Sequence, residues 1–458
     1  MVSTFSMQKN TFDLLYKKIL NPSKALCRKE FSYFGYSYGE VFELAAGLSK
    51  NLSGRDGENI LCLCTENKAM VAACILASFT GACKLILPYS LSPQALMEMY
   101  EAVNFNGAIA DHPEELPQGV EVITPLPGSI SGIDSKALRD PDKPFLYLFT
   151  GGSTGKPKVW SKSPRNMLAE AFYLKEKFAL SDKDLFIATV PPYHIYGLLF
   201  SVLIPFISQA GSLPDIYTFP QEIISTINKH KATVLVSIPI HYRSLKVDNL
   251  AAPSLKAAFS SSGALDNSDA KYFHEKTGLG ITEIYGSTET GGIATRSITE
   301  NTDSWKPFDI VSWRLAGKRL SVKSDFASQE MERDKESFCL TGDEAREDVD
   351  NRFVLLGRAD GIVKVAGKRV DLTDVQNKIK ALPEVSDAIV IALPEEKGRE
   401  NVIAALVACS LTEVQIRKKL MNILEPYAVP RRIKIVRQIT RTATGKVDRR
   451  RIERLFIK

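Results

Sequence analysis

The sequence is poor in the features that mark disulfide-stabilised, zinc-binding and membrane-spanning proteins. Its seven cysteines are scattered and odd in number, and the closest pair, Cys62 and Cys64, is too close for a zinc site. This usage predicts reduced thiols in a cytoplasmic protein. The N-terminus is polar, so we expect no secretory leader. The longest apolar run, residues 198–207, contains Ser201 and Pro205 and is too short for a transmembrane segment.

The composition predicts a globular protein with an uneven charge distribution. Hydrophobic residues make up 44% and charged residues 24% of 458 residues, and the net charge is +6. Residues 411–458 hold fourteen Lys and Arg against four Asp and Glu. No interleaved aromatics or known module accompany them, so we expect no nucleic acid binding. An acidic partner protein, a phosphate substrate and a solvated charged face remain as alternatives.

Short apolar segments alternate with helical patterns through the first half of the chain. Strands are predicted at residues 59–64, 83–88, 107–110, 120–124, 145–149, 186–190 and 233–239, and helices at 38–52 and 68–79. This alternation predicts an α/β fold with largely parallel sheets. Short strands follow from about residue 295, and an α+β unit follows residue 361. We therefore predict two domains, residues 1–358 and 359–458.

The stretch "LFTGGSTGKPK", residues 148–158, has the composition of a phosphate-binding loop. It is not a P-loop, because Pro157 follows Gly155-Lys156 where the Walker pattern needs a serine or threonine, and Thr150 replaces its first glycine. A flexible surface loop is the alternative, although the loop directly follows a predicted strand. Hydroxyl donors, glycines for close backbone approach and one cation remain available: Thr150, Gly151, Gly152, Ser153, Thr154, Gly155 and Lys158.

Seven motifs follow in a fixed order: "LFTGGSTGKPK", "PPYHIYG", "SSGAL", "EIYGSTETGG", "TGD", "LLGRADGIVKVAGKRV" and "TATGKVDRR". In this order they resemble the motifs of the adenylate-forming superfamily, which includes acyl- and aryl-CoA synthetases, nonribosomal adenylation domains and firefly luciferase. The resemblance covers nearly the whole chain. It implies a large N-terminal domain of βα layers with a small distorted β-barrel, followed by a small mobile α+β domain.

The resemblance also implies a reaction. A carboxylate attacks the α-phosphate of ATP, which gives an acyl-adenylate and pyrophosphate, and a thiol then displaces AMP to form a thioester. Such chemistry needs positioning and charge neutralisation but no protein nucleophile. The five histidines and the lack of a convincing Ser-His-Asp set agree with that requirement. The implied cofactors are ATP, Mg²⁺, and either CoA or the phosphopantetheine of an acyl carrier protein.

Roles for single residues follow from the resemblance. The loop donors Thr150, Ser153, Thr154 and Lys158 would hold the β- and γ-phosphates, Thr288 the α-phosphate, and Glu289 the Mg²⁺. If "YGSTET" stood alone, a helix N-cap at Ser287 or Thr288 would be the alternative. The adenosine would be held by a further set: Ser262, Gly263, Ala264, Tyr285, Gly286, Asp343 and Arg358.

The second domain is expected to move between two arrangements. Lys446 would assist adenylation, and the domain would then rotate about Asp360 and bring the turn at Gly367 to the pantetheine tunnel. The chain departs from the family pattern at Gly151, Val159, Gln376 and Thr440, none of which is catalytic in that pattern.

His194 in "PPYHIYG" would border the acid pocket, with a core histidine satisfied by the backbone as the alternative. Amino-acid-activating members of the superfamily place an aspartate in this segment to pair with the substrate ammonium. Residues 191–205 contain no Asp or Glu, so the resemblance implies a fatty or aryl acid without an α-amine. Leu198, Leu199, Phe200 and Ile293 indicate an apolar pocket. A non-catalytic nucleotide-binding relative and an enzyme with another acceptor remain alternatives, although Lys446 and Glu289 are both present.

Overall fold

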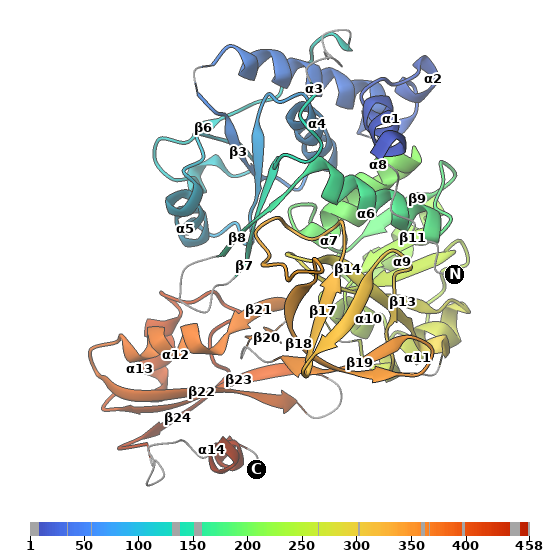
Figure 1. Ribbon diagram of the computed structural model, residues 1–458. Helices are drawn as coiled ribbons and strands as arrows, with labels where there is room; N and C mark the ends of the chain where they lie inside the picture. The colour runs from blue at the N-terminus through green and yellow to red at the C-terminus, as the bar shows by residue number, and fades with distance from the viewer. Residues whose placement is uncertain are drawn as a thin grey trace.

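The computed structural model describes residues 9–33, 35–55, 57–130, 138–150, 158–263, 265–300, 303–358, 362–365, 367–395, 399–439 and 449–456. Several predicted site residues lie outside these ranges: Gly151, Gly152, Ser153, Thr154, Gly155, Ala264, Asp360 and Lys446. Figure 1 shows the arrangement of the described elements.

A six-stranded sheet forms the first layer. Its order is β6–β5–β3–β4–β7–β8, and all its pairs are parallel except the β7–β8 hairpin. The strands are β3 (Ile60–Cys64), β4 (Lys84–Leu87), β5 (Gly107–Ala110), β6 (Glu121–Val122), β7 (Leu146–Thr150) and β8 (Lys158–Lys162). Alternate side chains of β3 enter two cores, with Leu61 and Leu63 on one face and Cys62 and Cys64 on the other. Both faces are therefore covered, as expected for parallel strands.

A nine-stranded sheet forms the second layer, in the order β15–β14–β13–β12–β11–β9–β10–β1–β2. Its strands are β1 (Glu30–Ser32), β2 (Tyr36–Ser37), β9 (Leu185–Ala188), β10 (Gly211–Ile216), β11 (Val234–Ser237), β12 (Ala257–Ser260), β13 (Ile281–Ser287), β14 (Gly291–Ser297) and β15 (Lys306–Pro307). Phe186 enters the core shared with the first sheet, whereas Ile187 enters a separate outer core. The central strands are parallel, which confirms the predicted α/β class.

Helices fill the space around and between the two sheets (Figure 1). They are α1 (Lys9–Ile19), α2 (Lys24–Cys27), α3 (Tyr38–Ser53), α4 (Lys68–Phe79), α5 (Pro93–Val103), η1 (Pro113–Glu115), α6 (Pro164–Lys177), α7 (Ile195–Gly197), η3 (Leu198–Leu203), α8 (Ile204–Ser208), α9 (Pro220–His230), α10 (Pro239–Ser244), α11 (Asn267–Thr277) and η4 (Ile298–Glu300). Helices α3, α4 and α6 contribute to the shared core, and α9, α10 and α11 to the outer core.

A small antiparallel sheet follows the two layers, where the sequence predicted a distorted barrel. Its order is β16–β17–β18–β19. The strands are β16 (Ser312–Ala316), β17 (Arg319–Lys323), β18 (Cys339–Asp348) and β19 (Arg352–Arg358). A bridge between Trp305 and Phe353 joins the β19 edge to the segment just before β15. The small sheet is thereby fastened to the edge of the nine-stranded sheet.

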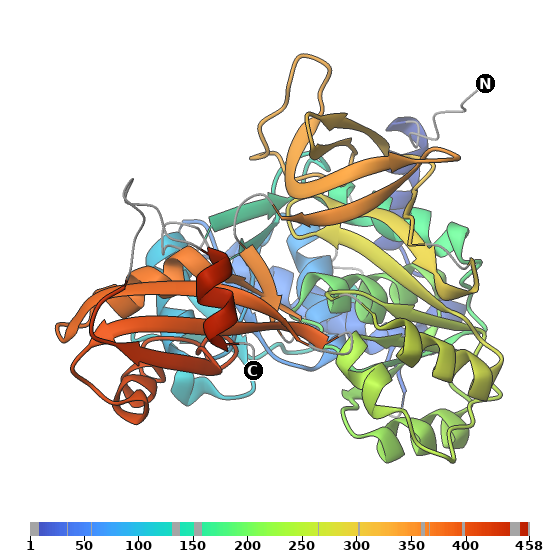
Figure 2. The ribbon, with the colours of Figure 1, turned by 90° about the horizontal axis from the view of Figure 1, so that it is seen from below.

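The C-terminal part is a separate α+β unit. It contains β20 (Ile362–Val365), β21 (Lys368–Asp371), α12 (Leu372–Lys380), β22 (Val385–Glu395), β23 (Arg399–Cys409), α13 (Glu413–Leu420), β24 (Arg432–Val436) and α14 (Arg449–Phe456). Val390 packs with α12 and α13 on one face of the β22–β23–β24 sheet. Ile389 and Ile391 pack with α14 on the other face, which is the face seen in Figure 2. The predicted boundary between residues 358 and 359 falls beside residues outside the description and stays a prediction.

Candidate active site

A cavity of about 220 Å³ lies where the C-terminal part meets the two N-terminal sheets. The N-terminal part contributes polar and apolar side chains to it: Thr150, Glu170, His194, Leu199, Phe200, Ser262, Ser287 and Thr288. The C-terminal part contributes the β20–β21 hairpin and the segment after α13: Lys364, Gly367, Lys368, Arg369, Glu425 and Tyr427. Glu425 also accepts a hydrogen bond from the Ser92 hydroxyl at 2.6 Å. The cavity is therefore formed jointly by segments far apart in the sequence.

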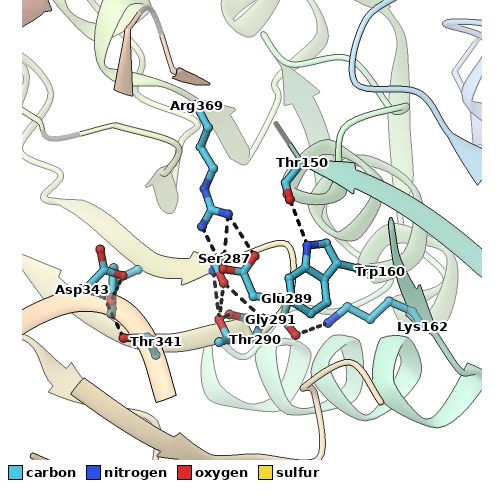
Figure 3. A network of polar contacts seen from close by, with 11 residues as sticks. Thr150, Trp160, Lys162, Ser287, Glu289, Thr290, Gly291, Thr341, Asp343 and Arg369 are labelled. Carbon is cyan, nitrogen blue, oxygen red and sulfur yellow. Dashed lines mark hydrogen bonds and ion pairs between the residues drawn. The ribbon is translucent and has the colours of Figure 1, made fainter. Parts of the chain in front are cut away.

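Arg369 of β21 reaches across the interface to Glu289, the residue predicted to hold Mg²⁺ (Figure 3). Its Nη1 donates to both carboxylate oxygens at 3.3 and 3.0 Å, and its Nη2 donates to Oε1 at 3.2 Å. Burial by itself raises the pKa of the Glu289 carboxyl, but the charge and hydrogen bonds of Arg369 outweigh it and lower the pKa to about 2. Sequence reasoning assigned no role to Arg369, although it lies in the quoted motif "GKRV".

The segment "GSTETG" forms the tight turn between β13 and β14. The Thr290 N–H donates to the Ser287 hydroxyl at 3.2 Å, and the Ser287 N–H donates to the Thr290 hydroxyl at 3.1 Å. A Cβ at Gly286 would lie 2.3 Å from the Gly291 carbonyl oxygen, so only glycine fits there. The helix N-cap alternative is wrong, because no helix begins here. The turn instead places Thr288 on the cavity wall.

Thr150 and Lys158 are cross-strand partners in the β7–β8 hairpin and flank the glycine-rich loop. The Trp160 indole N–H donates to the Thr150 hydroxyl at 2.9 Å (Figure 3), and the Lys158 ammonium lies 4.2 Å from the centre of the same ring. Trp160 therefore contacts two of the residues predicted to bind phosphate. No sequence pattern singled out this tryptophan.

Two residues predicted for the nucleoside are in direct contact. The Tyr285 hydroxyl donates to Asp343 Oδ2 at 2.7 Å, and the Tyr285 ring lies 5.3 Å from that of Trp305. Asp343 is also the cross-strand partner of Arg358 in the β18–β19 pair. The structure thus brings together the residues expected to contact base and ribose, although their contact with a nucleotide stays a prediction.

The predicted adenine and pantetheine segments also meet. Ser262 lies in the left-handed region at φ 70°, which is uncommon for a side chain with a Cβ and is often found at functional sites. Gly367 has φ 75°, and a Cβ built on it would lie 3.7 Å from the Ser262 Cβ. Both residues line the cavity, and Gly263 follows Ser262 directly.

His194 combines the two roles considered from the sequence. Its Nδ1 accepts a hydrogen bond from the Tyr196 N–H at 3.4 Å, and the side chain also lines the cavity. Enclosure by protein lowers the pKa of the imidazole to about 3, and Lys368, Lys364 and Arg369 add to this shift. His194 is therefore neutral at physiological pH.

The apolar wall differs in part from the prediction. Leu199 and Phe200 line the cavity, whereas Leu198 and Ile293 are buried in the shared core. The wall belongs to the π-helical turn η3, which precedes Pro205. Proline has no N–H for the Ser201 carbonyl, which instead accepts from the Ser212 hydroxyl at 3.1 Å.

Glu170 and Lys162 are two buried ionisable residues that sequence reasoning missed, and each affects the pKa of the other. Glu170 lies on the buried face of α6 with Met167, Ala171 and Leu174. A carboxylate among apolar residues at helical spacing is a pattern that could have been noticed in the sequence. Lys162 donates to the carbonyls of Glu289 and Phe326 at 3.2 and 2.6 Å. Burial raises the pKa of Glu170 to about 7, and it lowers the pKa of Lys162 to about 8.

The donor set of this cavity fits Mg²⁺ bound together with phosphates. In the described ranges, no group of three His, Cys, Asp or Glu side chains could hold a metal by itself. Mg²⁺ usually takes one or two carboxylates and completes its shell with substrate phosphates and water, so Glu289 alone suffices once Arg369 has left it. Among the helices described, none has the length and apolar character needed to cross a bilayer.

Comparisons with known proteins agree with this arrangement. A model described as AMP-binding enzyme matches residues 22–336, and one described as AMP-binding enzyme C-terminal domain matches residues 374–446. An oxalate–CoA ligase of Arabidopsis thaliana is 22% identical over 75% of this chain and 74% of its own. A 3-hydroxybenzoate–CoA ligase of an Aromatoleum species is 22% identical over 87% of each chain. The structure of o-succinylbenzoate CoA synthetase from Bacillus subtilis has a TM-score of 0.78 at 18% identity and covers 91% of this chain and 93% of that one.

The chain belongs to the AMP-binding enzyme family, which confirms the adenylate-forming superfamily that the motifs predicted. The predicted class of activity, an AMP-forming acid–thiol ligase, is confirmed at that level. The predicted architecture of a large N-terminal and a small C-terminal domain is confirmed as well.

Proposed function

We propose that this enzyme activates a fatty or aryl acid with ATP and transfers the acyl group to a phosphopantetheine thiol. The observation that carries this proposal is the shared cavity. The phosphate-binding candidate Thr150 and the pantetheine candidate Gly367 line it, together with Arg369, which bonds the metal-binding candidate Glu289. The names of the relatives as CoA ligases support the same reaction class.

In the first half-reaction, a substrate carboxylate oxygen attacks the α-phosphorus of ATP. The bond to the bridging oxygen breaks, and pyrophosphate leaves with that electron pair. Thr288 on the cavity wall is placed to donate to the α-phosphate, and Thr150 and Lys158 flank the loop predicted for the β- and γ-phosphates. Mg²⁺, when bound, would be held by Glu289 and would neutralise phosphate charge. Lys446 is predicted to add a cation in this step.

In the second half-reaction, the thiol sulfur attacks the acyl carbon and AMP leaves as the phosphate anion. The arrangement described here supports this step, because Gly367 lies against Ser262 and Arg369 occupies Glu289. Arg369 must withdraw before a metal ion takes the carboxylate. The two half-reactions therefore require different positions of the β20–β21 hairpin, with Asp360 as the predicted hinge.

The acid is proposed to lack an α-amine. No Asp or Glu occurs in residues 191–205, and Leu199 and Phe200 of this segment form the apolar wall. The test is acid-dependent exchange of pyrophosphate into ATP over a panel of fatty, aryl and amino acids. Exchange with no acid would contradict the proposed function, and exchange with amino acids alone would contradict the proposed acid class.

The acceptor is CoA or an acyl carrier protein, and helix α13 favours the carrier protein. Val414 and Met421 are 76% and 66% exposed, and the exposed Lys418 lies between them at helical spacing. Three further cations of the basic C-terminal segment are candidates for docking: Lys419 is paired with Glu384, Arg432 donates to a backbone carbonyl, and Arg431 is exposed. An exposed apolar and basic stripe suits an acidic helix with apolar contacts.

Thioester formation with CoA and with carrier protein, each at two salt concentrations, tests the acceptor. Lys418→Glu should raise the KM for carrier protein and leave those for ATP and acid unchanged. Salt should weaken loading of wild-type enzyme more than loading of the variant, because rim charges are screened within about 10 Å at 0.1 M salt. Faster use of CoA, with equal salt effects on both acceptors, would contradict the carrier-protein acceptor. The enzyme would then be an ordinary acyl-CoA synthetase.

A further inference from the structure

Two carboxylates on the cavity wall have incomplete hydrogen bonding in the described structure: Asp371 of the C-terminal part, through its Oδ2, and Glu170 of the N-terminal part. Glu170 is 2% exposed and lines the cavity from α6. Its Oε1 accepts from the Gly292 N–H at 2.7 Å. Its Oε2 is buried and has no hydrogen-bond partner among the described residues. Because buried polar atoms are nearly always paired in folded proteins, an unpaired carboxylate oxygen on a cavity wall is an acceptor that a ligand can satisfy.

The neighbourhood of Glu170 favours a neutral donor over a cation. Lys162 is fully buried nearby, and its charge acts directly on the Glu170 carboxyl. An incoming ammonium group would therefore be repelled by Lys162 and would also lose its own hydration. A hydroxyl group carries a much smaller desolvation cost and supplies the single donor that Oε2 lacks.

The walls beside Glu170 limit the shape of the group that reaches it. Leu199 and Phe200 of η3 line the same cavity, and the Phe200 ring packs 5.0 Å from that of Tyr196. Behind the carboxylate, a Cβ at Gly291 would lie 2.7 Å from Oε2 and 2.6 Å from the Phe326 Cβ. Strand β14 therefore closes the space behind Glu170. The apolar side chains of Leu199 and Phe200 suit a flat ring beside the carboxylate.

We propose that Glu170 accepts a hydrogen bond from a hydroxyl group at the far end of the acid substrate and thereby selects short hydroxyaryl acids. This inference rests on the proposed function and narrows its substrate class. The inference also accounts for the two glycines of "TETGG", because a side chain at Gly291 or Gly292 would collide with the carboxylate of Glu170.

The first test uses the wild-type enzyme and pyrophosphate exchange with matched acids. We expect 4-hydroxybenzoate or 3-hydroxybenzoate to exceed benzoate and 4-fluorobenzoate in kcat/KM by about tenfold or more, because a site built to bond a hydroxyl rejects analogues without it. A fluorine accepts hydrogen bonds only weakly and cannot donate one. Equal use of hydroxylated and unsubstituted acids would overturn the inference, as would a preference for long fatty acids or for amino acids.

The second test is Glu170→Gln. Its amide oxygen must accept from the Gly292 N–H, which turns the NH₂ group toward the position of Oε2. The acceptor for the hydroxyl is then lost, so the ratio of kcat/KM for hydroxybenzoate over 4-fluorobenzoate should fall by about tenfold. A purely structural role would lower both acids equally and leave this ratio unchanged. The thermal midpoint of the variant reports whether it folds, and Glu170→Asp, which keeps the charge but shortens the reach, should lower the same ratio.

Glu98→Gln is the matched control. Glu98 also lines the cavity, but both its oxygens already accept hydrogen bonds, from Tyr89 at 2.7 Å and from Gln94 at 3.1 Å. Its substitution should leave the hydroxyl-to-fluoro ratio unchanged, and an equal fall in both variants would overturn the assignment to Glu170. If no acid supports exchange in wild-type enzyme, the proposed function itself fails. If acids are activated without regard to a hydroxyl, only the present inference fails.

Discussion

Glu170 lines the cavity and Glu289 is bonded by Arg369, which also lines it. The surroundings of these two buried carboxylates shift their pKa values in opposite directions. Glu289 is held by the Arg369 guanidinium of the C-terminal part, and its pKa is lowered to about 2. Glu170 has one oxygen without a partner in the described structure, and burial raises its pKa to about 7. The first carboxylate is satisfied only while the C-terminal part is in place. The second depends on groups within the N-terminal part and on whatever enters the cavity.

The difference separates two kinds of functional residue. In the proposed two-step reaction the C-terminal part changes position, so a group paired with that part, such as Glu289, is suited to respond to which half-reaction is under way. A group left unsatisfied inside a fixed wall responds to the ligand, so Glu170 is suited to select it. Lys162 influences both residues, because it donates to the backbone carbonyl of Glu289 and its charge lowers the pKa of Glu170 against the larger effect of burial.

The largest effect is expected for Glu289→Gln. Loss of the charge that would hold Mg²⁺ should lower pyrophosphate exchange by about 10²–10³-fold, the usual cost of removing one group that stabilises transition-state charge. Folding should be retained, as judged by circular dichroism. The control is Glu170→Gln assayed with an acid that lacks a hydroxyl, which should lose far less. Exchange at the wild-type rate in the Glu289 variant would mean that the metal is held elsewhere.

Arg369→Gln should remove the partner of the Glu289 carboxylate and leave that carboxylate available to Mg²⁺. Because Arg369 and Mg²⁺ cannot occupy the carboxylate together, the half-saturating Mg²⁺ concentration for exchange should fall, by about fivefold at the lower end of typical coupling energies. Thioester formation from supplied acyl-adenylate should slow. Arg417→Gln, which breaks a 2.8 Å pair with Glu413 away from the cavity, should change neither quantity. An unchanged Mg²⁺ requirement in Arg369→Gln would show that the ion pair does not compete with the metal.

The free energy of unfolding at acid pH should depend on Glu289. Its pKa is lowered in the folded protein from 4.5 to about 2, so its stabilising contribution is present above pH 4.5 and is lost as the pH falls toward 2. The full shift corresponds to at most about 3 kcal/mol. Without Mg²⁺, denaturant unfolding of wild type and Arg369→Gln should therefore differ most near pH 5 and converge toward pH 2. A constant difference across this range would contradict the assignment.

Glu170 should make the free energy of unfolding change with pH in the opposite direction, and at higher pH. Its pKa is raised, so its contribution is greatest below pH 4.5 and is lost as the pH rises through about 7. Relative to wild type, Glu170→Gln should gain stability between pH 5 and 7. Lys162 also titrates near this range, with a pKa of about 8, so the comparison is best confined to pH 7 and below.

The smallest effect is expected at His194. Its pKa of about 3 keeps the imidazole neutral from pH 5 to 8, so it cannot give a charge-dependent inflection there. The profiles of kcat/KM against pH for wild type and His194→Asn should therefore run parallel. An inflection near pH 6.5 that disappears in the variant would show that the histidine titrates in the free enzyme.

Much of the fold was readable from apolar patterns. The predicted helix at residues 68–79 coincides with α4, and the predicted strands at 59–64 and 107–110 coincide with β3 and β5 within one residue. These segments are buried on both faces, so their apolar runs have few alternative structures.

Site residues could be located relative to one another from the sequence only where they lie within one short motif. Thr288, Glu289 and Gly286 share one turn, so their placement follows from a short segment. Trp160, Arg369 and Glu170 were missed as functional residues because their roles arise from contacts across 10, 80 and 122 residues of chain. Leu198 and Ile293 were assigned to the pocket by proximity in sequence, yet they face the core. Which side of a buried helix or strand meets a cavity is decided by tertiary packing.

The C-terminal sheet has an apolar core on each of its two faces, one against α12 and α13 and the other against α14. Its cohesion is therefore largely its own, whereas its described contacts with the remainder include polar pairs such as Ser92 with Glu425. Heat should accordingly melt the chain in more than one cooperative step, and a calorimetric trace should resolve a smaller transition from a larger one. A single melting temperature would then describe neither part, and ligands that bind both parts should draw the two transitions together.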